Sequence, residues 1–276
     1  HVNLGGQTLT LTNGNGGAFN GSINGSGNLT LDSGSLTLSG SNTYTGVTTI
    51  GNDATLTAAS AQALTGTTAI HLNGGVLGVS NIDLATSAPV VLGADGGTLT
   101  LSRSHTLELD GAISGNAGVL NLLGIGGGTV LLTNANNSYQ GGTRISNTFG
   151  GTNVVDVTAT SALGSGDVTV GASSALNFIG HGSTIVSAGS RTINVGGTAS
   201  ISFGNSTSLG SSTINMAAGS SGTIGGADMG SAHLNNAGMV QVSDAASGHA
   251  VLTNAASGTV PSGSQIGDPF RSEDHT

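Results

Sequence analysis

The sequence predicts an all-β fold, a parallel β-helix or β-solenoid, from three observations. Short runs such as Leu36–Leu38 alternate apolar and polar residues, which directs neighbouring side chains to opposite faces of a strand. A stretch of the chain recurs, because Thr129–Ile145 repeats the pattern of Ser35–Ile50. The 276 residues include 50 glycines and only 6% charged residues, so corners are polar and no charged face follows the repeats. Very short strands in a repeated pattern favour stacked turns over a sandwich or a barrel.

The recurring stretch has six matched positions in each copy, and we call these positions the repeat signature. They are Leu36, Leu38, Tyr44, Gly46, Thr48 and Ile50 in the first copy, and Val130, Leu132, Tyr139, Gly141, Thr143 and Ile145 in the second. Weaker matches extend the two diverged copies to about residues 5–84 and 96–180. The offset between the copies is larger for the pair Leu64 and Leu163 than for the pair Gly5 and Gly96, so small insertions separate the copies.

The composition argues against several classes of protein. A formal net charge of −9, the absence of lysine and four scattered arginines disfavour nucleic-acid binding, which draws on clustered basic residues. No apolar run is long enough to cross a membrane as a helix. The regular alternation of Leu, Val and Ile argues against disorder. Because the chain begins at His1 and not at methionine, we interpret it as an excised or processed piece of a longer protein.

We assign residues 1–260 to the β-helix and expect strands at short intervals along it. Asn13–Asn20 is expected to be a Gly/Asn corner, and Thr57–Ala63 is expected to form one helical turn at most. At roughly 20–25 residues per turn the chain makes about 12 turns, and ~4.8 Å between turns gives a rod on the order of 55–60 Å long. Residues 261–276 hold two of the three prolines and a cluster of charges, which predicts a linker or disordered tail.

One stretch resembles a known family, because Gly25–Ile50 reads GSGNLTLDSGSLTLSGSNTYTGVTTI. It resembles the passenger-associated repeat of bacterial autotransporters, the type V secretion proteins, in which Leu-Thr-Leu-Ser-Gly-x-Asn-Thr-Tyr-Thr-Gly-Gly-Thr follows a Gly-Ser-Gly-x-Leu segment. Val47 replaces the second glycine of that pattern, and the second copy departs further, with Asn134 in place of a glycine. The resemblance implies a right-handed parallel β-helix that is secreted or displayed at the cell surface, on the passenger side of a Gram-negative outer membrane. It also implies an outer-membrane β-barrel in a C-terminal part of the protein.

Three sets of polar residues are candidates for catalysis, and each has a structural alternative. Asp32-Ser33-Gly34 is similar to the nucleophile loop of trypsin-like proteases, but such a serine needs a base and an orienting acid, and we favour a turn between strands. His181-Gly182 and Arg191 resemble elements of β-helical pectin hydrolases, which also need paired carboxylates. Glu108 and Asp110 share one strand face, where we favour a solvated edge over acid–base or Ca²⁺ chemistry.

The remaining candidates concern binding. Seven histidines are scattered along the chain without the spacing of a zinc site. Thr-x-Thr pairs such as Thr98 and Thr100 could form ranks that bind ice or glycans, although threonine is also common on the polar face of a strand. Tyr44 and Tyr139 occupy the same repeat position. An aromatic ring there could be a carbohydrate platform, but we favour a ring that caps the corner with its hydroxyl in solvent.

Together these observations predict a non-enzymatic rod with no catalytic residue, no cofactor and no metal. We expect an adhesin, a self-association module or a stalk, since many weak contacts along one side add up. The expected partners are host-surface glycans or proteins, or another copy of the chain, and not nucleic acid. Two alternatives stay open. A β-helical enzyme acting on polysaccharide needs carboxylates clustered on one face, and an ice- or glycan-binding solenoid needs threonines in register over several turns.

Overall fold

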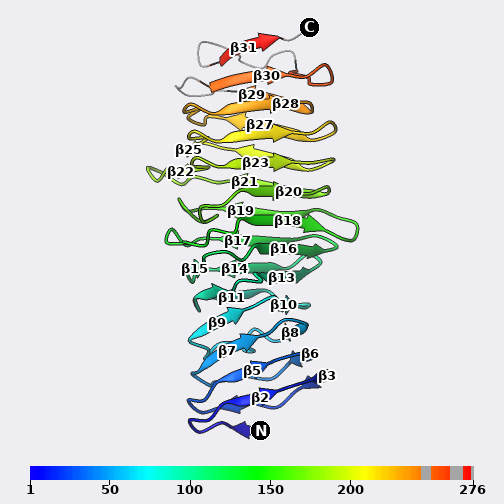
Figure 1. Cartoon of the computed structure of the whole chain (residues 1–276), viewed down its shortest axis with the longest axis vertical. Coiled ribbons are helices and arrows are strands. Elements are labelled where there is room, and N and C mark those ends of the chain that lie inside the picture. The colour runs from blue at the N-terminus through cyan, green and yellow to red at the C-terminus, as the bar shows by residue number, and fades with distance from the viewer. Residues whose placement is uncertain (244–249, 262–269, 275–276) are drawn as a thin grey trace.

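The computed structural model, which describes residues 1–243, 250–261 and 270–274, stacks short strands into a rod with the two termini at opposite ends (Figure 1). Within the described residues there is no helix, and every pairing between named strands is parallel. The predicted all-β parallel solenoid is therefore confirmed, as is the expectation of about 12 turns.

One sheet runs the length of the rod and contains 13 strands. Its members, in spatial and sequence order, are β3 (Gly14–Phe19), β6 (Gly34–Leu38), β8 (Ala54–Ala58), β10 (Val76–Val79), β13 (Gly97–Ser102), β16 (Leu120–Ile125), β18 (Thr143–Asn147), β20 (Val168–Val170), β23 (Thr192–Val195), β26 (Thr213–Met216), β28 (His233–Asn236), β30 (Ala250–Asn254) and β31 (Phe270–Asp274). Each turn of the chain adds one strand to this sheet.

Two further sheets cover different stretches of the rod. The six-stranded sheet belongs to the N-terminal turns and contains β2 (Leu9–Leu11), β5 (Leu29–Leu31), β7 (Val47–Ile50), β9 (Ala69–Leu72), β12 (Val90–Leu92) and β15 (Ile113–Ser114). The eight-stranded sheet belongs to the later turns and contains β11 (Leu84–Thr86), β14 (Thr106–Leu109), β17 (Gly128–Leu132), β19 (Asn153–Val157), β21 (Ser174–Phe178), β24 (Ser200–Phe203), β27 (Ser221–Gly225) and β29 (Met239–Ser243). The remaining strands form two pairs, β1 (Val2–Asn3) with β4 (Ile23–Asn24) and β22 (Val186–Ser187) with β25 (Thr207–Ser208).

The register between turns aligns like residues inside the rod. One inward column of the 13-stranded sheet consists of Leu36, Leu56, Leu77, Leu99, Leu122, Ile145, Val170, Val195 and Met216. In the eight-stranded sheet, the stacked rings of Phe178 and Phe203 lie 4.5 Å apart and within 7° of parallel. The turns differ in length, since Val170 pairs with Val195 across a long turn and Asn236 pairs with Asn254 across a short one. The core is thus a set of apolar ladders that run along the rod, and burial of these ladders drives folding.

Three local expectations need correction or completion. The segment Asn13–Asn20 is not a corner, because Gly14–Phe19 forms β3 and pairs with β6 through a register shift between Asn15 and Gly17. Thr57–Ala63 contains no helix, which agrees with the expected limit of one helical turn, and its first two residues end β8. Within the expected tail 261–276, Phe270–Asp274 forms β31 and pairs with β30. The rest of that tail, apart from residue 261, lies outside the described residues.

Candidate functional site

The apolar residues of the repeat signature fill the core of the rod. Leu38, Ile50, Leu132 and Ile145 are fully buried, and Val130 is 2% exposed. Leu36 is partly buried and packs against the same core. The two copies use different sides of the rod, since the threonine and isoleucine of the first copy lie in the six-stranded sheet and those of the second lie in the 13-stranded sheet. The signature therefore marks a local packing unit and not one side of the solenoid.

The two tyrosines lie inside the rod, so both predictions for them, the carbohydrate platform and the corner cap with its hydroxyl in solvent, are wrong. Tyr44 and Tyr139 are fully buried. The hydroxyl of Tyr44 hydrogen-bonds Thr48 Oγ1 at 2.6 Å, and that of Tyr139 hydrogen-bonds Thr143 Oγ1 at 2.7 Å. Burial raises the pKa of Tyr44, and it raises the pKa of Tyr139 to about 12. Neither ring can serve as a carbohydrate platform, and neither hydroxyl faces solvent, because a buried hydroxyl needs a partner and the inward threonine four residues later supplies it.

An asparagine two residues before each tyrosine joins three successive turns, and the sequence analysis missed this role. Asn42 Oδ1 accepts a hydrogen bond from the backbone N–H of Ile23 at 2.9 Å, in the preceding turn, and its Nδ2 donates to the carbonyl of Ala63 at 2.8 Å, in the following turn. Asn137 makes the same two bonds in the second copy, from Ile113 N at 2.7 Å and to Ala162 O at 2.7 Å. Both asparagines are almost completely buried. The shared Asn-x-Tyr spacing was the available signal.

The signature glycines are required by close approach between turns. A Cβ at Gly46 would overlap the carbonyl oxygen of Gly27, and a Cβ at Gly141 would overlap the carbonyl oxygens of Ala117 and Gly118. The obstacle is backbone in both cases, so no side-chain movement could relieve it. Asparagine, tyrosine, glycine and threonine together thus form a unit that closes one turn onto the next.

Arg191 supports the second copy from the neighbouring turn, and it does not lie in a catalytic cluster. Its guanidinium donates to four backbone carbonyls: Leu163 at 2.9 Å, Gly164 at 2.8 Å, Gly166 at 3.4 Å and Ala188 at 2.7 Å. Burial lowers the pKa of this half-buried guanidinium from its ordinary value. Its role here is to satisfy carbonyls that the corner leaves without partners.

The first copy has a cavity between the corresponding two turns. The cavity has a volume of about 170 Å³, and its lining residues are Ala61, Leu64, Thr65, Thr67, Leu84, Ala85, Thr86, Ser87 and Ala88. None of these lining residues is an arginine. Instead, the hydroxyl of Thr67 donates to Gly46 O at 3.0 Å and hydrogen-bonds Thr48 Oγ1 at 2.8 Å, so it extends the tyrosine–threonine pair by one turn. The two copies close the same corner with different polar groups.

The serine and histidine candidates lie in turns. The hydroxyl of Ser33 donates to the carbonyl of Thr12 at 2.6 Å, which ties its turn to the preceding one. His181 is exposed, and its carbonyl accepts a hydrogen bond from Thr184 N at 3.2 Å. His105 lies 3.4 Å from a carboxylate oxygen of Asp83. Among residues 1–243 and 250–261, no three His, Asp or Glu side chains gather as a metal site would require.

The carboxylate candidates face outward along the eight-stranded sheet. Glu108 aligns with Leu131 in the next turn, and Leu131 aligns with Asp156 in the turn after that. Asp156 is held by Asn177, whose Nδ2 donates to its Oδ1 at 2.8 Å. Asp110 lies beyond the end of β14, where Thr133 donates to it. Three cavities of the rod have volumes of about 560, 170 and 460 Å³, and none of the three is lined by Glu108, Asp110 or Asp156. The enzyme alternative stays a prediction.

Threonines align over three turns in one column, and pairs of threonines align across neighbouring turns elsewhere, as Thr192 does with Thr213. On the six-stranded sheet, Thr10, Thr30 and Thr49 lie in register over three turns, and His71 follows them. On the 13-stranded sheet, the Thr-x-Thr pairs of β8 and β13 are separated by the Val76-Leu77-Gly78 segment of β10. In the part of the chain that the structure describes, the longest column of threonines therefore spans three turns.

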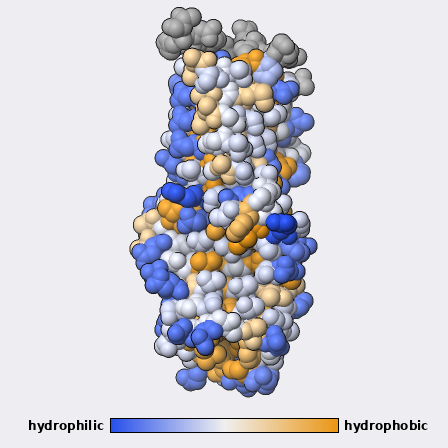
Figure 2. All heavy atoms as spheres, turned by 90° about the vertical axis from the view of Figure 1, so that its right-hand side faces the viewer, coloured by the Kyte–Doolittle hydropathy of each residue, from blue (hydrophilic) through white to orange (hydrophobic). Residues whose placement is uncertain are grey.

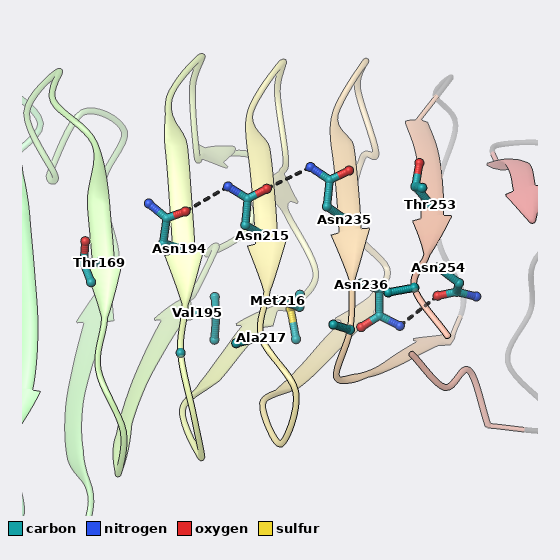
Figure 3. Close-up of a pocket in the computed structure, with 13 residues that line it drawn as sticks. Thr169, Asn194, Val195, Asn215, Met216, Ala217, Asn235, Asn236, Thr253 and Asn254 are labelled. Atoms are coloured by element: carbon teal, nitrogen blue, oxygen red, sulfur yellow. Dashed lines mark hydrogen bonds between the residues drawn. The ribbon is translucent and has the colours of Figure 1, made fainter. Parts of the chain in front are cut away.

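The largest of these cavities is an open groove of about 560 Å³ on the outer face of the 13-stranded sheet, between β20 and β30. Three outward asparagines form a ladder along it (Figure 3): Asn215 Nδ2 donates to Asn194 Oδ1, and Asn235 Nδ2 donates to Asn215 Oδ1, both at 2.8 Å. We call these three residues the amide ladder and the groove the amide groove. Thr169 precedes the ladder in register and Thr253 follows it.

The groove combines this polar ladder with short side chains. Beside the ladder, the chain leaves each strand through Gly196, Ala217, Ala237 or Ala255, and all four line the groove. None of its lining residues is charged; they are Thr169, Asn194, Val195, Gly196, Asn215, Met216, Ala217, Asn235, Asn236, Ala237, Thr253, Asn254 and Ala255. Sequence analysis missed this groove. The available signal was the recurrence, once per turn, of an outward asparagine after an inward aliphatic residue, in Ile193-Asn194, Ile214-Asn215 and Leu234-Asn235.

No protein-family model, curated protein or solved structure matches this chain. In the part of the chain that the structure describes, there is no helix with the length and hydropathy that a membrane crossing requires.

Proposed function

We propose that the chain is a segment of an autotransporter-type passenger, a non-enzymatic rod on the outside of a Gram-negative cell. The observation that supports this function best is the inward use of the repeat signature. The tyrosine and threonine of each copy bond to each other in the core, and Asn42 and Asn137, two residues before the tyrosines, tie successive turns together. The stretch that resembles passenger repeats therefore builds the rod and leaves the flanks free for contact.

A rod of this kind can act as a stalk, an adhesin or a self-association module. With 13 strands in the longest sheet and ~4.8 Å between them, it spans roughly 55–60 Å. The side seen in Figure 2 presents residues of mainly intermediate hydropathy, with strongly hydrophilic residues gathered toward its two margins. Such a surface favours many weak contacts over one deep binding pocket.

Surface display tests this function. The chain is placed between a secretion signal and an autotransporter translocator domain, expressed in a Gram-negative bacterium, and stained with antibody on intact cells. We expect surface staining and a protease-resistant fragment of the size of the rod. Retention of folded chain in the periplasm, while an established passenger in the same vector reaches the surface, would contradict the proposal.

The polysaccharide-enzyme alternative has one supporting observation, the alignment of Glu108 and Asp156 two turns apart on one outward column. Release of reducing sugar from a panel of plant and bacterial polysaccharides tests it. Turnover that Glu108→Gln abolishes and Asp95→Asn leaves intact would replace the proposed function with an enzymatic one.

A further inference from the structure

We propose that the amide groove binds an extended, uncharged polysaccharide that lies along the rod axis across β20, β23, β26, β28 and β30. The proposal rests on the proposed function, because it names the ligand class of the same rod acting as an adhesin. It is carried by the geometry of the amide ladder, the shape of the groove and the absence of charge in its lining.

The ladder offers donors and acceptors at a regular spacing. A primary amide has two N–H donors and an oxygen with two lone pairs. Within the ladder each amide-to-amide bond uses one donor and one acceptor, so the central Asn215 keeps one N–H and one lone pair for a ligand. Neighbouring strands place these groups ~4.8 Å apart, which is close to the advance per sugar ring in an extended glycan. A sugar hydroxyl is itself both donor and acceptor, so it matches an amide in either orientation.

The ladder also holds its side chains in place before a ligand arrives. Each hydrogen bond between two side-chain amides, at 2.8 Å, fixes the orientation of both amides, and Asn215 is held from both sides. Flexible surface side chains lose rotamer freedom when they bind a ligand, and this loss weakens binding. Hydrogen bonds within the amide ladder reduce that loss, because they already set the orientation of each amide in the free protein.

The floor of the groove accepts the apolar side of a sugar ring. Gly196, Ala217, Ala237 and Ala255 carry at most a methyl group, so a chain can approach the backbone closely along the line where the turns leave the sheet. A pyranose has polar edges and C–H-rich faces. The groove offers both kinds of surface, since the amide ladder lies on one side of it and Ala217 lies on the other, beside the amides of Asn236 and Asn254 (Figure 3).

The charge of the chain favours some possible ligands of the amide groove over others. The groove has no charged lining residue, and the whole chain carries a net charge of −9. An anionic polymer would be repelled by the chain and would find no cation in the groove. A second copy of this chain would bring another nine negative charges. A neutral glycan meets neither obstacle, so it is the occupant that the observations favour.

Calorimetric titration of the purified full chain tests the proposal. The probes are neutral hexasaccharides of glucose, xylose, mannose and N-acetylglucosamine in β-linkage, with hexagalacturonate as an anionic probe of equal length. We expect at least one neutral hexasaccharide to bind and hexagalacturonate not to bind. Asn215→Leu should weaken binding at least tenfold because it removes the central amide, and Ala217→Phe should abolish it because the ring fills the groove.

Two matched substitutions control for general surface effects. Asn121 lies in the same outward column as the ladder but outside the groove, and Ala135 is an exposed alanine in a loop. Asn121→Leu and Ala135→Phe should leave affinity unchanged. Circular dichroism and the urea midpoint verify that all four variants fold like the parent chain.

Three results would overturn the inference. These are no binding of any neutral hexasaccharide at millimolar concentration, binding that is equally strong in Asn215→Leu and Ala217→Phe, or self-association of the chain that Ala217→Phe abolishes. The last result would assign the groove to a second copy. In each case surface display of the rod would still be observed if the proposed function holds, so failure of the ligand assignment is distinguishable from failure of the function.

Discussion

Replacing Asn42 by leucine should destabilise the rod well beyond the effect of a surface substitution. Leucine has nearly the shape of asparagine, but it can neither accept the hydrogen bond from Ile23 N nor donate to Ala63 O. Both backbone groups then remain buried without a partner, and each such group costs about 1–3 kcal/mol. The expected loss in the free energy of unfolding is therefore about 2–6 kcal/mol. Asn137→Leu should show a loss of the same size, because the second copy repeats both bonds.

The assay is urea unfolding followed by circular dichroism. With an m-value of roughly 3 kcal/mol/M, the midpoint should fall by about 0.7–2 M. Asn136→Ala is the matched control, since Asn136 adjoins Asn137 and its side chain is exposed. The control should change the free energy of unfolding by less than about 0.5 kcal/mol. If Asn42→Leu and Asn137→Leu also stay within that range, the asparagines do not join the turns and the reasoning is refuted.

Three further predictions follow from the same corners. Burial raises the pKa of Tyr139 from 10.0 to about 12, so its stabilising effect is fully present below about pH 10, and up to about 3 kcal/mol of the free energy of unfolding is lost as the pH rises toward 12. Tyrosinate absorbance should show both tyrosines titrating above pH 10. Titration at the ordinary pKa would show that the rings are accessible to solvent. Gly46→Ala should cost about 3 kcal/mol, the upper end for overpacking, because its Cβ meets backbone. Gly17→Ala, with nothing within 4 Å of its Cβ, should be nearly neutral in the same urea assay. Arg191→Lys should lower the thermal midpoint, since an ammonium cannot reach four carbonyls at once, and an equal effect from Arg144→Lys, at an exposed position, would contradict that role.

The apolar ladders were predictable because the sequence of each strand indicates by itself which residues face inward. In Leu36-Thr37-Leu38 the period of two identifies a strand without knowledge of its neighbours. The strand β3 shows where this fails. Its sequence, Gly-Asn-Gly-Gly-Ala-Phe, has no alternation and is typical of a corner, yet it pairs with β6. Here the strand is imposed by the adjacent turn, and tertiary context overrides a weak local preference.

The candidate site was less predictable because it depends on register. Asn194, Asn215 and Asn235 each lie one turn apart in the sequence, and each is unremarkable within its own strand. Only parallel pairing with no slip brings their amides into contact. The buried position of Tyr44 is hard to predict for a related reason, because the partner of its hydroxyl, Thr48, belongs to a residue type that is common on the polar face of a strand. Burial of a polar residue is decided by its partners, and sequence spacing alone does not reveal them.

Hydrogen exchange of the Ile23 and Ile113 amides tests the central claim, that Asn42 and Asn137 each join three successive turns from inside the rod. In the parent chain both amides should exchange in the slowest class. Asn42→Leu should accelerate exchange at Ile23 and leave Ile113 protected, and Asn137→Leu should do the reverse. Fast exchange at these amides in the parent chain, or acceleration of both by either substitution, would contradict the account.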